Sequence, residues 1–347
     1  MPSNHPSFFS DFNKLAELVL SYRAAKPMLV ALHYDLFTHI ARRLNTPEEL
    51  ATRLGLDRRA VRLLLDAIVS LGYLDKRGGR YRNTRPSRRL LVSGSPEYVG
   101  SSLKYQEMTW DAWSDLKNVL KEGRPRRELL DWIHKDFFTA DYLRAMGNVS
   151  REPARELARR LTWTGVSRTL DVGSGAGNFS AAFVEACPRV EAVLLDLPKS
   201  LAVARGLLSG HPRKDRFRYR QANYLQDSLG IEEFDLVLIS NVTRVEDEAA
   251  NRVLIDKAYR ALRHGGRLVI HDYAIEPART APRFSALLGL HLLLFTGKGE
   301  VYTLQEYRTW LRDRGFQKLY NIKIAAESLH PSFAVVGTKS RHARIRI

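Results

Sequence analysis

The stretch that decides the fold is LDVGSGAGN, residues 170–178. An apolar, β-branched run from Arg168 to Val172 leads into the glycines, and a helical pattern follows them at about residues 177–186. Glycines at a strand-to-helix turn allow the backbone to approach a ligand closely, and amides at the helix start favour polar or anionic groups. The stretch therefore predicts a ligand-binding turn between a strand and a helix.

Outward from this turn, strand patterns alternate with helical patterns. Further short runs of apolar or β-branched residues lie at 191–195, 217–221, 234–240 and 267–272. Helical stretches separate or follow them at about 199–209, 247–263 and 303–314. This alternation is typical of an α/β fold in which helices cover both faces of a mostly parallel sheet. We expect a Rossmann-like domain over residues 164–339.

Two carboxylates sharpen the prediction for the ligand. Asp171 precedes the first glycine and suits the cationic amino-acid end of S-adenosylmethionine (SAM). Asp196, at the end of the second strand, can accept hydrogen bonds from two ribose hydroxyls. Asn178 stands where a dinucleotide fingerprint has its third glycine. We therefore expect SAM as the cofactor, bound over a turn whose glycines are Gly173, Gly175 and Gly177.

The amino-terminal 97 residues begin with helical patterns. Between Asp11 and Ala41 the apolar residues recur at helical spacing, and Pro27 predicts a break between two amphipathic helices. Thr46 and Glu49 then form a capping box at the start of a further helix that stops at Gly55.

A second helix and a hairpin follow that capped helix. Asp57 opens the second helix, which ends at Gly72. Residues 73–83 have strand residues on both sides of the turn Gly78-Gly79, as a hairpin does. Helix, turn, helix and hairpin in this order make a winged helix.

A winged helix can bind DNA or serve as a dimerisation platform. Arg58, Arg59 and Arg62 at the start of its second helix favour a major groove. No Asn or Gln stands among them to read adenine edges, and the same module dimerises many enzymes. We expect dimerisation and no specific nucleic-acid partner, and a DNA-binding regulator that senses SAM stays the alternative.

Residues 98–163 are predicted to be helical throughout and to link the two domains. Aromatic residues are scattered along this segment, and ligand pockets form preferentially between domains. We expect some of these rings to line an acceptor pocket, and the candidates are Tyr105, Trp110, Trp113, Trp132, Phe137, Phe138 and Tyr142.

Composition narrows the class of protein. The formal net charge of +17 is spread along the chain, and only Lys339 to Arg346 reads as a basic cluster, a frayed tail over 340–347. The single cysteine, Cys187, excludes an internal disulfide and a multi-thiolate zinc site. No apolar run is long enough for a membrane span, and the first residues do not resemble a signal peptide, so we expect a cytoplasmic protein.

Nearly the whole chain resembles bacterial and plant class I SAM-dependent O-methyltransferases of the caffeate and hydroxyneurosporene type. The likeness includes GGRYRNT at 78–84, the linker with Phe138 and Met146, the glycine turn, and the segment from HDY at 271–273 to GEVYT at 299–303. The resemblance implies an interlocked homodimer whose amino-terminal domain completes the partner's acceptor pocket. It also implies a small organic acceptor from secondary metabolism.

Residues of the family's cofactor site carry over to positions in this chain. The resemblance implies that Gly173 contacts the methionine part of SAM, and Asp196, followed by Leu197, the ribose. Asn223 and Tyr224 fall where the family has Asp-Phe near the adenine, and an amide oxygen can still accept from the adenine amino group. The floor of the cofactor site would be Ser240 and Asn241.

One position departs from the family's pattern. A histidine after the fourth strand takes the acceptor's hydroxyl proton in this family, and Arg244 stands at that position here. A guanidinium stays protonated and cannot act as a general base. The two acids that flank the histidine in plant relatives have counterparts in Asp272 and Glu300, and we expect Arg244 to form an ion pair with one or both.

Three outcomes of this departure are open. Methyl transfer can proceed by alignment alone, which suits an acidic phenol, an enol or a carbon nucleophile. Another base can act, and His291 is the candidate, although a hydrogen-bonded histidine in an apolar helix explains it equally well. Arg244 can also have abolished methyl transfer. O-methylation, C-methylation and other SAM chemistry share the cofactor half, so the residues do not separate them.

A metal site is not predicted. His271, Asp272 and His291 offer two imidazoles and a carboxylate. Adjacent strand residues point to opposite faces, so His271 and Asp272 are not expected to meet at one ion.

Overall fold

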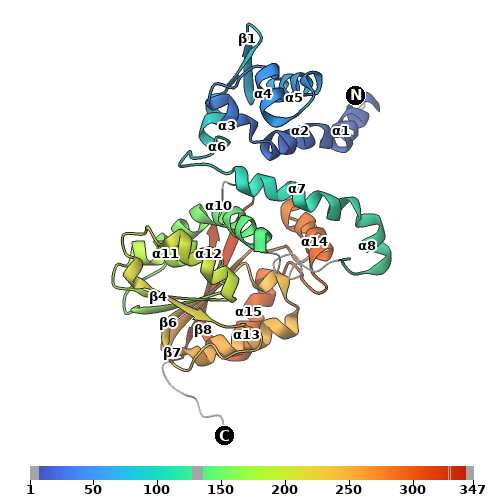
Figure 1. Cartoon of the computed structure of the whole chain (residues 1–347). Helices are drawn as coiled ribbons and strands as arrows, with labels where there is room; N and C mark the ends of the chain where they lie inside the picture. Colours follow the sequence, from blue (N-terminus) through green and yellow to red (C-terminus); the bar gives the residue numbers. More distant parts are fainter. Residues whose placement is uncertain (1–7, 127–135, 327, 329, 341–347) are drawn as a thin grey trace, which may run out of the picture. The chain divides into compact units, whose positions relative to one another are not determined.

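The computed structural model describes residues 8–126, 136–326, 328 and 330–340. The chain forms two compact units, residues 1–110 and 111–347. Figure 1 labels most of their helices and strands. The boundary falls inside helix α7 (Gly100–Ser114), within the segment predicted as a linker.

Helices occupy most, but not all, of the described part of that segment, because residues 98–99, 123–126 and 161–163 are not helical. After α7 come α8 (Leu116–Glu122) and α10 (Asp136–Arg160). Residues 127–135, which include Trp132, lie outside the described residues, and so do the side chains of Phe137 and Phe138.

The amino-terminal unit has the helix, helix and hairpin order that the sequence predicts. Its elements are α1 (Phe8–Leu20), α2 (Tyr22–His33), α3 (Leu36–Ala41), α4 (Pro47–Leu54), α5 (Arg58–Ser70), β1 (Leu74–Arg77), β2 (Arg80–Asn83) and α6 (Arg85–Leu90). The predicted capping box is present at α4, where the Thr46 hydroxyl accepts from the Glu49 amide at 3.3 Å and the Glu49 carboxylate accepts from the Thr46 amide at 3.0 Å. The hairpin turns at Gly78 and Gly79, both with positive φ.

The predicted break at Pro27 is wrong. Pro27 lies inside α2, and the chain breaks instead at Ser21, whose hydroxyl donates to the Leu18 carbonyl at 2.8 Å. A proline costs the helix one amide donor, and packing of Ala31 and Leu32 into the unit's core outweighs that loss. The helix before the break, α1, buries none of its residues.

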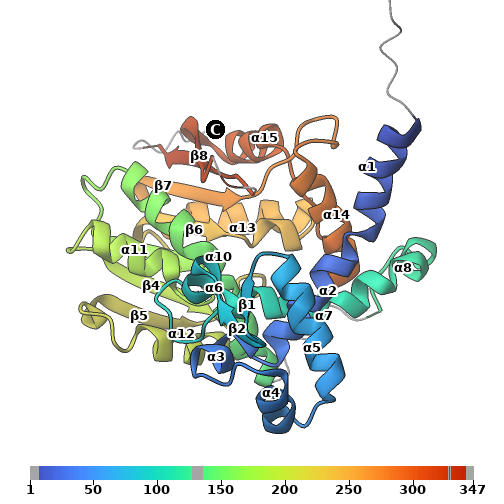
Figure 2. The ribbon, with the colours of Figure 1, turned by 90° about the horizontal axis from the view of Figure 1, so that it is seen from above.

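The carboxy-terminal unit is built on a seven-stranded sheet, as Figure 2 shows from β5 at one edge to β8 at the other. The order is β5-β4-β3-β6-β7-β9-β8, and the strands are β3 (Arg168–Val172), β4 (Glu191–Asp196), β5 (Phe217–Gln221), β6 (Phe234–Ser240), β7 (Leu262–Asp272), β8 (Phe316–Ile324) and β9 (Ser332–Lys339). The first five in this order are parallel, which confirms the predicted Rossmann-like class.

Helices cover both faces of this sheet (Figure 1). Along β6, Val237 and Ile239 pack against α13 (Glu248–Ala261) and α15 (Leu304–Arg314). The alternate residues, Leu236 and Leu238, pack against α10 and α11 (Asn178–Ala186). Two more helices belong to the unit, α12 (Pro198–Leu208) and α14 (Arg283–Phe295). No helix in the described ranges is long and apolar enough to cross a membrane.

The last two strands are antiparallel, and the sequence patterns do not identify them. β9 pairs with both β7 and β8, so it fills the gap between them. This placement corrects the interpretation of Lys339 as part of a frayed tail. Lys339 ends β9, its side chain is 6% exposed, and its ammonium donates to the Leu262 carbonyl at 2.7 Å. Residues 341–347 lie outside the described residues.

The strand order places a ligand site. The chain runs outward from β3 to β4 and β5, then returns to the other side of β3 for β6 and β7. In open α/β sheets, ligands bind outside the carboxyl ends of the strands at the point where the order reverses. Here that point lies beyond β3 and β6, which end at Val172 and Ser240.

Candidate active site

The glycine turn after β3 has a backbone that only glycine adopts easily. Gly173, Gly175 and Gly177 have φ of 66°, 53° and 79°. A Cβ on Gly173 would lie 2.6 Å from Cγ2 of Val242, and one on Gly177 would lie 2.8 Å from Cδ1 of Leu208. The turn is therefore packed against the loop after β6 on one side and against α12 on the other, so a side chain at either glycine would require Val242 or Leu208 to move.

Asp196 lies against this turn. Its carboxylate accepts from the Gly175 amide at 2.8 Å and from the Leu197 amide at 2.7 Å. Burial raises the pKa of Asp196, and these two amide hydrogen bonds oppose the rise. The end of β4 and the glycine turn thus form one structure, and the contact of Asp196 with a ribose stays a prediction.

Asp171 is more deeply placed. It is 3% exposed, and its carboxylate accepts from the Ser180 hydroxyl on α11 at 2.8 Å. Burial raises the pKa of Asp171 to about 7, with a further rise from the negative charge of Asp196 and a reduction from the Ser180 hydrogen bond. Its expected contact with the amino-acid end of SAM stays a prediction.

The loop after β5 holds Tyr224 in a fixed position. The Tyr224 hydroxyl donates to Oε1 of Glu246 at 2.9 Å, and Oε2 of Glu246 lies 2.5 Å from Nζ of Lys298. Burial, then the neighbouring Glu246 charge, raises the pKa of Tyr224 far above its usual value. Asn223 turns its side-chain oxygen to the Leu225 amide at 2.9 Å. Sequence reasoning missed Glu246 and Lys298, because no motif marks either residue.

The loop after β6 is held by a network around Asn241, whose φ of 58° is rare for a non-glycine residue. The Asn241 amide group donates to the Ser240 hydroxyl at 3.0 Å, and its side-chain oxygen accepts from Nη1 of Arg244. The Ser240 hydroxyl also lies 2.9 Å from Nδ1 of His271. These bonds place residue 244 just beyond the carboxyl end of β6.

Arg244 forms an ion pair with Asp272. Nη1 of Arg244 donates to Oδ1 of Asp272 at 2.6 Å, with side-chain exposures of 15% and 0%. Burial alone would lower the pKa of Arg244, but the Asp272 charge raises it overall. Arg244 is therefore a permanent cation, as the sequence analysis expects.

The other predicted partner of Arg244 lies elsewhere. Glu300 is 52% exposed and forms its ion pair with Arg279 at 2.7 Å. Of the two acids considered, only Asp272 is paired with Arg244 in the structure.

Three rings from other elements lie within electrostatic reach of Arg244. Its charge opposes ionisation of His291 and favours that of Tyr142 and Tyr273. The Tyr273 ring centre is 5.4 Å from Cζ of Arg244. The centre of the His291 ring lies 4.5 Å from that of Phe295 and 6.2 Å from that of Trp113. Burial lowers the pKa of His291 to about 4, and the Arg244 charge contributes to that decrease. Of the aromatic residues expected in an acceptor pocket, Tyr142 and Trp113 thus belong to this cluster.

His271 and Asp272 face opposite sides of β7, as expected. His271 bonds the Ser240 and Ser332 hydroxyls at 2.9 Å each, and Asp272 bonds the Thr243 hydroxyl at 2.9 Å. Burial lowers the pKa of His271 to about 4.

Comparison with known proteins assigns the chain. Residues 113–317 match the family model of the O-methyltransferase domain, and residues 16–93 match the O-methyltransferase dimerisation domain. The chain belongs to the O-methyltransferase family. It is a SAM-dependent methyltransferase, as the resemblance implies.

Individual relatives of the methyltransferase span nearly its full length. The 3-hydroxy-5-methyl-1-naphthoate 3-O-methyltransferase of Streptomyces sahachiroi is 29% identical over 320 residues, 90% of this chain and 91% of the relative. The N,N-dimethyltransferase OxyT of Streptomyces rimosus is 29% identical over 87% of this chain and 90% of its own. Human N-acetylserotonin methyltransferase, crystallised with SAM, has a TM-score of 0.85 at 21% identity, covering 98% of this chain and all of that one.

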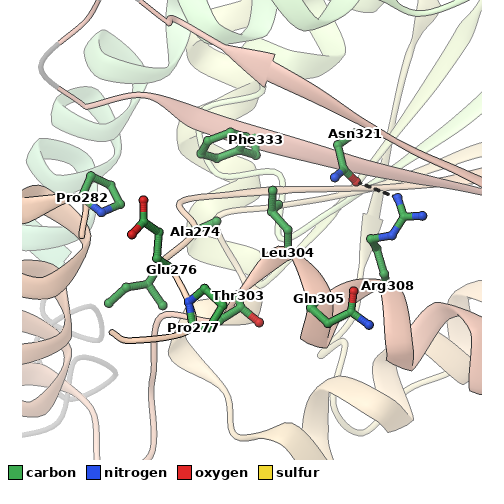
Figure 3. Close-up of a pocket in the computed structure, with 11 residues that line it drawn as sticks. Ala274, Glu276, Pro277, Pro282, Thr303, Leu304, Gln305, Arg308, Asn321 and Phe333 are labelled. Atoms are coloured by element: carbon green, nitrogen blue, oxygen red, sulfur yellow. Dashed lines mark hydrogen bonds between the residues drawn. The ribbon is translucent and has the colours of Figure 1, made fainter. Parts of the chain in front are cut away.

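A separate pocket of about 400 Å³ opens on the methyltransferase beyond β7. Figure 3 shows Phe333 and Leu304 on its walls, with Glu276 at one end and Arg308 hydrogen-bonded to Asn321 at the other. Its lining is Ala274, Ile275, Glu276, Pro277, Pro282, Thr303, Leu304, Gln305, Arg308, Asn321 and Phe333, which includes none of the predicted site residues.

Proposed function

We propose that the protein methylates a hydroxyl oxygen of a small aromatic or enolic acceptor from secondary metabolism, without a general base at position 244. The observation that carries the proposal is the Arg244–Asp272 ion pair in the loop beside the glycine turn. Val242, two residues before Arg244, packs on Gly173, so the loop that holds the arginine is next to the turn that holds the cofactor.

The cofactor site fits SAM by shape and charge. The glycines expose bare backbone at the turn, where a Cβ on two of them would clash with neighbouring side chains, so the ligand can approach the main chain closely. Asp196 supplies a carboxylate for ribose hydroxyls. Tyr224, fixed by Glu246, offers an aromatic face for the adenine. We assign the amino-acid end of SAM to Asp171 and the glycine turn. Bound there, SAM supplies a methyl group on a positively charged sulfur.

The residues near Arg244 indicate which acceptors react. Arg244 cannot take a proton. His291, with a pKa of about 4, is neutral at pH 7 and a weak base. The acceptor's hydroxyl must then ionise largely by itself, which favours acidic phenols and enols. The protein contributes alignment, which is worth several kcal/mol of the barrier in well-oriented reactions.

A homodimer is part of the proposal. Helix α1 buries none of its residues within one described chain, and its exposed apolar side chains are Phe8, Phe9, Phe12, Leu15, Leu18, Val19 and Leu20. A surface of this kind marks a protein interface. Light scattering should give twice the chain mass, and Leu18→Glu should give monomers, whereas Leu207→Glu on α12 should not. A monomeric wild type would contradict the dimer.

The DNA-binding alternative is less well supported by the residues concerned. Arg58 pairs with Glu48, and Arg62 pairs with Asp66 at 3.1 Å, so part of the basic face is neutralised. Steep, salt-dependent binding to random duplex DNA would restore the regulator hypothesis.

The test of function uses labelled SAM with a panel of phenols, enols, carboxylic acids and aromatic amines, followed by mass analysis. The relative named for a hydroxynaphthoate directs the first choice of acceptors, and OxyT's name requires the amines. Label on oxygen of an acidic hydroxyl supports the proposal. Transfer only to nitrogen or carbon, or none while SAM binds, would contradict it.

A further inference from the structure

Arg244 uses only part of its hydrogen-bonding capacity within the protein. A guanidinium carries five N–H donors. Both of its side-chain hydrogen bonds to residues that the structure describes, to Asn241 and Asp272, come from Nη1. Nε and Nη2 therefore keep three N–H donors that no described residue accepts, and the side chain remains 15% exposed.

Asp272 fixes the position of this guanidinium through Nη1 and leaves its Nε and Nη2 donors unused. Its two oxygens accept from the Thr243 hydroxyl at 2.9 Å, the Arg244 amide at 3.3 Å, Nη1 of Arg244 at 2.6 Å and the Tyr273 amide at 2.9 Å. Four donors satisfy a carboxylate. The Thr243 hydroxyl is itself 2.8 Å from the Tyr307 hydroxyl on α15, so the acid is fixed from a third element.

The other titratable groups that face Arg244 are neutral at pH 7. Burial raises the pKa of Tyr142 on α10 and of Tyr273 after β7, and it raises that of Tyr307 further. Burial lowers the pKa of His291 on α14 and that of His271 on β7 to about 4. An anion that reaches Nε and Nη2 thus meets no second carboxylate among these groups.

We propose that the Nε–Nη2 edge of Arg244 binds a planar pair of acceptor oxygens that share one negative charge. The inference rests on the proposed function, because it takes residue 244 to face the acceptor. Nε–H and Nη2–H lie side by side in the guanidinium plane, so each can donate to a different oxygen of one planar anion. A lone phenolate oxygen cannot match both donors in this way. The anion is a carboxylate or a deprotonated hydroxyl conjugated to a neighbouring carbonyl.

The experiment measures binding without cofactor. The dimeric protein is titrated with 1-hydroxy-2-naphthoate, 1-hydroxy-2-acetonaphthone and 2-naphthol, which share a ring system and differ in their oxygens. Absorbance reports how much of each hydroxyl is ionised when bound. We expect one or both two-oxygen probes to bind at least about ten-fold more tightly than 2-naphthol, as bonds to a charged group predict. Tight binding of the naphthoate would identify the anion as a carboxylate. Tight binding of the acetonaphthone in its ionised form would identify the anion as a deprotonated hydroxyl conjugated to a carbonyl.

Variants assign the effect to Arg244. Arg244→Gln should weaken the two-oxygen probes roughly ten- to hundred-fold, and Arg244→Lys, which keeps the charge but not the fork, should lie between. Arg252→Gln, which removes a guanidinium from the surface of α13, should leave binding unchanged. Arg244→Gln leaves Asp272 buried without a cation beside it, which can prevent folding. Calorimetry with S-adenosylhomocysteine therefore checks that this variant is folded. If it is not, the comparison of the wild type with Arg244→Lys decides the test.

The outcomes separate this inference from the proposed function. Equal binding of 2-naphthol and the two-oxygen probes, or wild-type binding in the folded Arg244 variants, overturns the inference even if methyl transfer occurs. Selective anion binding that depends on Arg244, with no methyl transfer to any hydroxyl, overturns the proposed function and leaves the anion site.

Discussion

The two halves of the proposed site, one for the cofactor and one for the acceptor, are held together in different ways. At the end of β4, Asp196 is fixed by two backbone amides, those of Gly175 and Leu197. At the end of β7, Asp272 is fixed by two backbone amides and by the side chains of Thr243 and Arg244. Around Asp196 the proposed cofactor half is therefore set mainly by main-chain geometry, whereas the proposed acceptor half depends on which side chains stand in one loop.

This difference bears on how each half tolerates substitution. A main-chain site is lost when a side chain is added, because the backbone can no longer take the required shape. A side-chain site keeps its frame and changes its chemistry when one residue is replaced. Arg244, at the position where the resemblance implies a histidine, illustrates the second case.

The largest expected effect is at Gly173. Gly173→Ala would put a Cβ 2.6 Å from Val242 at a φ of 66°, so it should reduce affinity for SAM by at least about 100-fold in calorimetry, as steric clash adds to backbone strain. Gly175→Ala is the matched control, because its φ of 53° gives the strain while its Cβ would be 3.6 Å from Leu143. Equal losses in both variants would show that strain alone matters.

The next effect is at Asp196. Asp196→Asn replaces one carboxylate oxygen with an amide NH2 group, which then faces the N–H of Gly175 or Leu197. The remaining neutral oxygen also accepts more weakly from the ribose hydroxyls than a carboxylate does. We expect SAM affinity to fall roughly ten- to hundred-fold, by the same measurement. Asp215→Asn, an exposed change on the loop before β5, should have no effect. Unchanged affinity in Asp196→Asn would remove this residue from the cofactor site.

A smaller effect concerns pH. The raised pKa of Asp171, about 7, means that its carboxyl gains a charge as pH rises from 5.5 to 7.5. A cationic amino group is held better by the charged form, so the Kd for SAM should fall with rising pH by up to about ten-fold. In Asp171→Asn the Kd should be flat over that range. A flat wild-type profile would place Asp171 in the packing of α11 alone.

The sequence predicts the glycine turn and the strands around it because these features are local. Gly173 through Asn178 and Asp196 follow strand patterns directly, and the five parallel strands lie within a few residues of the predicted ranges. The same locality explains the success at Thr46 and Glu49, three residues apart. Pro27 was misread because its cost is local, while its compensation comes from the core of the unit.

The acceptor half was only partly predictable, because its contacts join distant segments. The sequence predicts an acidic partner for Arg244 but does not choose between Asp272 and Glu300. The folded structure makes that choice, because Asp272 ends β7 beside Arg244 whereas Glu300 pairs with Arg279. Glu246 and Lys298 join the Tyr224 loop to the segment after α14, across more than 50 residues, and no spacing rule relates them. The pairing of β9 with β7 was not predictable for the same reason, because β7 ends about 60 residues before β9 begins.

The most direct test of the central claim, that no side chain of the acceptor half takes the hydroxyl proton, is the pH dependence of kcat/KM for a series of acceptors of graded acidity. The account predicts an inflection that moves with the pKa of each acceptor in the wild type, and one near pH 6.5, the ordinary value of an imidazole, in Arg244→His. An inflection that stays at one pH for every acceptor in the wild type would reveal a protein base and contradict the account.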